Sequence, residues 1–130
     1  MEKEFVPYEQ ALLLKELGFD EPCLGYWFTN PQKKYIPEIC QGSWNNMTSQ
    51  ENIKTLYYGI SGPTFSQAFR WFREKYEYEI SIHKLIEEDG YMASIGWEGV
   101  KDIMEQVEGT TYEEAELFCL QQMIILCKQN

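Results

Sequence analysis

The residues best suited to chemistry are Arg70, Trp71 and Arg73, which include both arginines of the chain. A guanidinium group binds phosphate or carboxylate through paired hydrogen bonds, and an indole ring stacks on a base or a cation. With Trp44, from a loop-like stretch rich in glycine and asparagine, they form a candidate site for a small anionic, nucleotide-like ligand. In the alternative interpretation the arginines pair with surface glutamates, and Trp71 packs beneath the first helix.

Catalytic and metal-binding motifs are missing from the sequence. It contains no Walker loop, no G-x-G-x-x-G and no G-x-S-x-G. The one histidine, His83, alternates with Ile80 and Ile82, so we expect it to be exposed on a strand. The four cysteines lack the close paired spacing of a zinc site. We therefore predict no catalytic residue, no metal and no cofactor. An enzyme with an unrecognised carboxylate site stays open as an alternative, because general acid–base sites need no motif.

The charge balance limits the partners. The chain has 21 acidic and 11 basic side chains, a formal net charge of −10. Nucleic acids and anionic lipids bind through lysine and arginine, so we expect neither a nucleic-acid nor a membrane partner. No apolar run approaches the roughly 20 residues of a membrane-spanning helix, and the first residues lack the pattern of a secretion signal. We expect a cytoplasmic protein with reduced cysteines.

Three helices are expected to position these residues, and the second and third carry the clearest start signals. The first runs from Pro7 to Leu17 and ends at Gly18, a residue suited to a left-handed helix end. The second follows the capping-box spacing of Thr64 and Gln67. Its apolar face is predicted to comprise Phe65, Ala68, Phe69, Phe72 and Tyr76. The third follows a second capping box, Thr111 with Glu114, and is apolar on most sides. A helix of that kind is predicted to be the central one.

The remaining segments suggest strands and loops. Residues 78–97 alternate in polarity around Asp89-Gly90, which predicts a β-hairpin. Residues 23–28 indicate a short strand, and residues 31–48 indicate a loop. Ser49 and Asn52 favour a short helix through Tyr58. Residues 98–109 are interpreted as either a short helix or an insertion, because their apolar residues have helical spacing. Together these segments predict one α+β domain over residues 1–130, in which a small antiparallel hairpin or sheet packs against three to four helices.

Four sequence blocks carry a resemblance to known proteins. They are FVPYEQA at 5–11, LGFDEPC at 17–23, PTFSQAFRWFREKY at 63–76 and TYEEAE at 111–116. The chain resembles small uncharacterised proteins encoded by phages and prophages of gut bacteria, which have no assigned activity. The resemblance implies a mobile-element setting, in which small acidic proteins often bind a host protein or sequester a small signalling molecule. We therefore expect a non-enzymatic binding protein whose partner is a host protein or a small anionic ligand. A purely structural or oligomeric protein is a further alternative.

Overall fold

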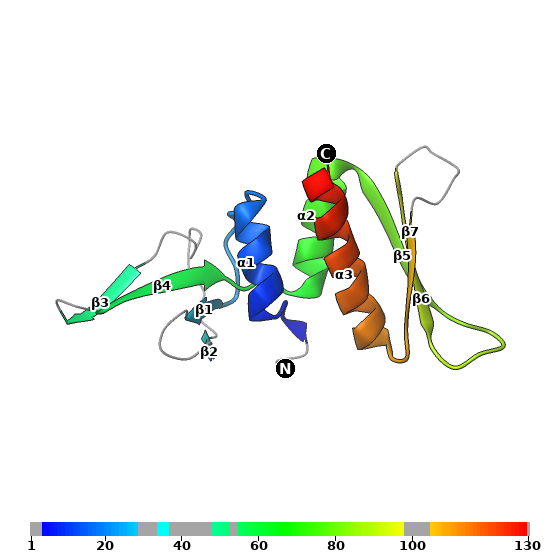
Figure 1. Ribbon diagram of the computed structural model, residues 1–130, viewed down its shortest axis with the longest axis horizontal. Coiled ribbons are helices and arrows are strands. Elements are labelled where there is room, and N and C mark those ends of the chain that lie inside the picture. The colour runs from blue at the N-terminus through cyan, green and yellow to red at the C-terminus, as the bar shows by residue number, and fades with distance from the viewer. Residues whose placement is uncertain (1–3, 29–33, 37–47, 53–54, 98–104, 130) are drawn as a thin grey trace. The chain divides into compact units, whose positions relative to one another are not determined.

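The computed structural model describes residues 4–28, 34–36, 48–52, 55–97 and 105–129, and these carry three helices and two antiparallel sheets (Figure 1). The α+β prediction is therefore confirmed. Contacts between Cα atoms group the chain into two compact units, residues 1–64 and residues 65–130. That the chain forms one domain stays a prediction.

The first unit contains helix α1, Tyr8–Glu16, and its end is the one that the sequence predicts. Gly18 has a φ of 101°, in the left-handed region that favours glycine. The amide of Phe19 donates to the carbonyl of Leu14 at 2.9 Å, and the amide of Gly18 donates to Lys15 at 3.0 Å. These two hydrogen bonds define a Schellman motif. Leu14 and Phe19 are both buried beside it.

Four strands form the sheet of the first unit, with the order β2-β1-β4-β3. They are β1 (Tyr26–Phe28), β2 (Lys34–Ile36), β3 (Thr48–Asn52) and β4 (Thr55–Ser61). All neighbouring pairs are antiparallel. The helix predicted from Ser49 to Tyr58 is therefore wrong. The segment Thr55-Leu56-Tyr57-Tyr58 is rich in residues that favour strands, and pairing with β1 and β3 outweighs a weak helix-start signal.

The second unit opens with helix α2, Phe65–Tyr76, which begins directly after Thr64, as the capping-box spacing predicts. Its buried residues are Phe65, Ala68, Phe69, Trp71 and Phe72. Four of these five belong to the predicted apolar face, and Tyr76 is half-buried. The fifth, Trp71, extends the buried face beyond the predicted stripe. After α2 the chain turns sharply at Glu77, whose φ is 61°.

The predicted hairpin is present and gains a third strand. Strands β5 (Tyr78–Lys84) and β6 (Tyr91–Trp97) pair antiparallel, with Tyr78 opposite Trp97 and Lys84 opposite Tyr91. Gly90, with a φ of 128°, lies at the end of the connecting loop. Strand β7, Glu105–Gly109, pairs antiparallel with β6. The helical interpretation of residues 98–109 is therefore wrong at 105–109, because half-buried Val107 alternates with exposed neighbours, the period of a strand. Residues 98–104 lie outside the described residues.

Helix α3, Tyr112–Gln129, packs along the β5-β6-β7 sheet, as predicted for the C-terminal helix (Figure 1). The Thr111 hydroxyl accepts a hydrogen bond from the Glu114 amide at 3.1 Å, which caps the helix start. The Glu114 carboxylate accepts from Thr110. The core side of α3 comprises Ala115, Cys119, Leu120, Met123, Ile124 and Cys127. These residues recur at three- and four-residue spacing, and the sheet contributes Ala93 and Ile95 to the same core.

Candidate functional site

Of the candidate anion site, the structure describes two exposed arginines and one buried tryptophan. Arg70 and Arg73 are exposed on α2 and lie three residues apart, which places them on neighbouring parts of one helix face. Trp71, by contrast, is only 6% exposed. Its ring is therefore not presented to solvent beside the guanidinium groups. Trp44 lies outside the described residues. That the two arginines hold an anion stays a prediction.

An aromatic cluster accounts for the position of Trp71. The indole meets the ring of Phe72 edge-on with centroids 5.1 Å apart, and the ring of Tyr76 at 5.7 Å. The Nζ atom of Lys75 lies 4.9 Å from the centroid of the indole. Phe72 in turn stacks on Tyr78 at 6.2 Å. These contacts join α2 to strand β5, so Trp71 stabilises the second unit.

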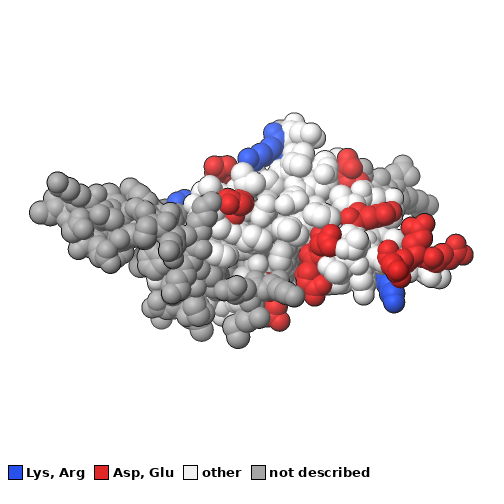
Figure 2. Space-filling view, turned by 60° about the horizontal axis from the view of Figure 1, so that its bottom comes forward, with Lys and Arg blue, Asp and Glu red and all other residues white. Residues whose placement is uncertain are grey.

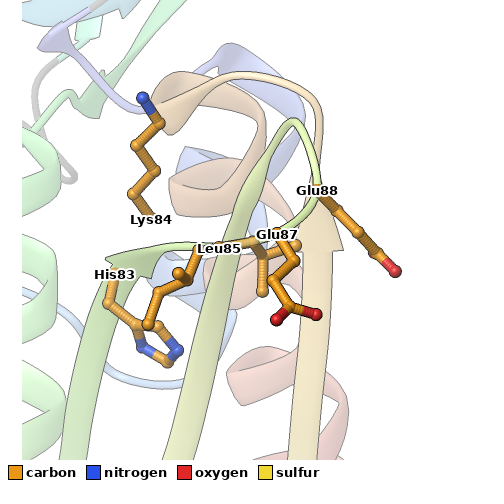
Figure 3. A pocket seen from close by; sticks show the side chains of 6 residues that line it. His83, Lys84, Leu85, Glu87 and Glu88 are labelled. Atoms are coloured by element: carbon orange, nitrogen blue, oxygen red, sulfur yellow. The ribbon is translucent and has the colours of Figure 1, made fainter.

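A pocket of about 460 Å³ lies at the end of the β5–β6 hairpin. It is lined by the last two residues of β5 and the first four of the hairpin loop, which we define as residues 85–90: His83, Lys84, Leu85, Ile86, Glu87 and Glu88. In Figure 3 the side chains of His83, Leu85 and Glu87 point to one side of the chain, whereas Lys84 points to the other. The pocket therefore combines an apolar surface with an imidazole and carboxylates. His83 is exposed on its strand, as predicted.

Ile86 is the most exposed large apolar side chain that the structure describes, at 99%. It precedes Glu87, Glu88 and Asp89, all of which are exposed; we call these three residues the acidic rim. In Figure 2 acidic side chains outnumber basic ones, and they gather toward the side on which the hairpin lies in Figure 1. Ile86 was not among the site residues expected from the sequence. The available signal was Leu85-Ile86, two apolar residues in a segment too long for a two-residue turn.

Two buried thiols lie on α3, but their surroundings do not activate them. Burial, followed by the charge of Glu116, raises the pKa of Cys119 to about 12. Burial also raises the pKa of Cys127, although hydrogen bonds from Tyr78 and Tyr76 and the charge of Lys75 act in the opposite direction. A cysteine nucleophile requires a lowered pKa and access to solvent. Both residues therefore act as small core side chains, and both are free thiols.

Searches for a metal site and for a membrane-spanning helix, and comparisons with known proteins, assign no further function to the described residues. Within the described ranges, no three His, Cys, Asp or Glu side chains are grouped in a way that could hold a metal ion. In that same part of the chain, no helix has the length and apolar character to cross a membrane. Comparison with protein-family models, with curated proteins and with solved structures finds no match to this chain.

Proposed function

We propose that this is a cytoplasmic protein of phage or prophage type that acts by stoichiometric binding to a protein of its bacterial host. The observation that carries the proposal is the hairpin loop, in which a 99% exposed Ile86 is followed by the acidic rim. An apolar side chain fully in water gains nothing for the fold, whereas it supplies an anchor once a partner covers it.

The free energy of burying Ile86 and the charge of the acidic rim favour a protein partner with a basic, apolar-lined surface. Burying a complete isoleucine side chain contributes about 2 kcal/mol, which corresponds to roughly a thirtyfold change in affinity. The acidic rim places negative charge next to that anchor along the loop. Charges at the edge of an interface speed association with an oppositely charged surface and reject surfaces of like charge. The loop thus combines an apolar contact with charge selection, while the pocket beside His83 and Glu87 offers space for a side chain of the partner.

A protein partner is better supported than the alternative small anionic ligand. A nucleotide site on α2 needs an accessible indole beside the arginines, and Trp71 is buried among aromatic rings. Binding without turnover is likewise better supported than catalysis by cysteine, because the pKa values of Cys119 and Cys127 are raised. Non-enzymatic recognition of a host protein is therefore the proposal that we carry forward.

Site-specific photo-crosslinking tests this function. A benzophenone amino acid replaces Ile86 in one sample and Phe118, an exposed apolar residue on α3, in a matched control. Both are irradiated in lysate of a host gut bacterium, and the adducts are identified by mass spectrometry. We expect one predominant host protein at position 86 and none at position 118.

Competition establishes that the adduct reports recognition. Excess unlabelled wild-type protein should abolish the adduct at position 86, whereas the same excess of an Ile86→Ala variant with the acidic rim changed to glutamine should not. If wild-type competitor leaves the adduct unchanged, or if both labelled positions give the same proteins, recognition through the hairpin loop is contradicted.

A further inference from the structure

Strand β5 is an edge of the three-stranded sheet, since the strand order is β5-β6-β7. It pairs with β6 over seven consecutive residues, from Tyr78 to Lys84, with no shift in register. Its polar side chains Glu79, Ser81 and His83 are exposed, and Ile80 and Ile82 are half-buried. A regular edge strand of this length is a template for a further strand.

The register shows which backbone groups of β5 point away from β6, toward the edge where the described residues place no further strand. The amide of Leu85 donates to the carbonyl of Gly90 at 3.0 Å, so residues 85 and 90 form a hydrogen-bonded pair. Such pairs alternate with non-hydrogen-bonded pairs along an antiparallel ladder. Continuing the alternation along β5, residues 83, 81 and 79 direct their backbone groups toward β6. Ile80, Ile82 and Lys84 therefore direct theirs toward the open side.

We propose that two copies of the chain pair through antiparallel β5 strands, about a twofold axis at Ser81. In this register Ile80 lies opposite Ile82 of the second copy, and their outward backbone groups form the new hydrogen bonds. Glu79 lies opposite His83 of the second copy. The result is a continuous six-stranded sheet with both α3 helices on one face. The two hairpin loops then lie toward opposite ends of that sheet.

Charge complementarity selects this register. Glu79 and His83 occupy a non-hydrogen-bonded pair, in which facing Cα atoms approach to about 4.5 Å. The imidazole can donate an N–H to the carboxylate whether or not it carries a charge. Twofold symmetry makes this contact twice. A register shifted by two positions about a neighbouring axis places Glu79 opposite Ser81 or Leu85, and the paired contact is lost.

A second copy fits β5 better than it fits the other edge. β5 is complementary to itself, which is what a twofold interface requires. Strand β7 spans five residues, against seven in β5, and carries no basic side chain, so two copies of β7 could not form an opposite-charge pair. The half-buried Ile80 and Ile82 meet their counterparts on the face that packs against α3. Pairing through β5 therefore extends the core of each copy.

Sedimentation equilibrium with a charge-exchange series tests the dimer. We expect the wild-type chain to be a dimer, and His83→Glu to weaken dimerisation about tenfold, since attraction becomes repulsion at two symmetric contacts. Adding Glu79→Lys to His83→Glu restores opposite charges and should return the dissociation constant to near its wild-type value. Glu108→Lys, an equal charge change on β7, is the matched control and should leave it unchanged.

Hydrogen exchange supplies a second readout that does not depend on any variant. In the dimer the amides of Ile80, Ile82 and Lys84 become protected as protein concentration rises, whereas those of Ser81 and His83 are protected at all concentrations by β6. A wild-type monomer at concentrations up to about 1 mM overturns the proposal. The proposal is also overturned if the wild type is a dimer but the double variant dissociates as readily as His83→Glu. Restoring opposite charges at positions 79 and 83 would then have no effect, so these two side chains would not face each other across the interface.

Discussion

Replacing Gly109 by alanine is expected to destabilise the second unit by about 2 kcal/mol. Gly109 ends β7 where the chain turns into α3. An added Cβ would lie 2.5 Å from the amide nitrogen of Ala115 and 2.9 Å from the carbonyl carbon of Glu114. Ordinary contacts to a Cβ begin at 3.4 Å, so the strand and helix must separate by nearly 1 Å. The amide of Ala115 cannot retreat freely, because it donates to Thr111 within the helix.

Gly90 also lies close to Gly109. A Cβ at Gly90 would lie 2.9 Å from the Gly109 carbonyl oxygen, so the end of the hairpin already approaches β7 closely. Overpacking two rigid elements costs about 3 kcal/mol. Loss of glycine flexibility in the unfolded chain returns about 1 kcal/mol of stability. The difference gives the net destabilisation.

The unfolding free energy of the second unit alone can be measured in urea, with amide hydrogen exchange in α3 as the probe. Glu108→Ala, at the exposed neighbouring position, is the control and should change the unfolding free energy by less than about 0.5 kcal/mol. Gly109→Ala could instead be as stable as the wild type, or more stable by the roughly 1 kcal/mol gained from a less flexible unfolded chain. Either result would show that β7 does not approach α3 as closely as described.

Three further outcomes are expected. Gly18→Ala should lower the stability of the first unit by about 1 kcal/mol in thermal unfolding, because its φ of 101° suits only glycine; no loss would argue against the Schellman motif. Burial, and then the charge of Glu113, raise the pKa of Glu116. The folded state therefore binds a proton at Glu116 more tightly than the unfolded state does, and the free-energy cost of ionising this carboxyl in the folded protein grows as pH rises above 4.5. Glu116→Gln should therefore be more stable than wild type at pH 7, with the gain vanishing as pH falls through 4.5; an equal gain at both pH values would contradict this. Iodoacetamide should label Cys119 only after denaturation, because burial raises its pKa to about 12, and rapid labelling of the native protein in peptide mapping would be inconsistent with that position.

Local signals predicted the helices well because their ends depend on near neighbours. Gly18 and Phe19 complete the end of α1 through hydrogen bonds to residues three and five positions away, and Thr111 caps α3 through the adjacent turn. The segment from Ser49 to Tyr58 failed because its structure depends on pairing with distant strands. A spacing of two polar residues contains no information about β1, which supplies part of that pairing.

The candidate site was less predictable than the fold. Trp71 was placed off the apolar stripe of α2, but a helix that meets a sheet and a second helix buries a wider arc than one stripe. Ile86 was overlooked for the opposite reason. An apolar residue between strands is usually assigned to the core, and only the three-dimensional course of the loop leaves it 99% exposed.

The most direct test of binding through the hairpin loop is calorimetric titration of the crosslinked host protein with the wild type and Ile86→Ala. We expect one host molecule per chain, and roughly thirtyfold weaker binding for Ile86→Ala. Phe118→Ala, which removes an exposed ring from α3, should bind as tightly as the wild type. Equal affinity of wild type and Ile86→Ala would contradict the central claim.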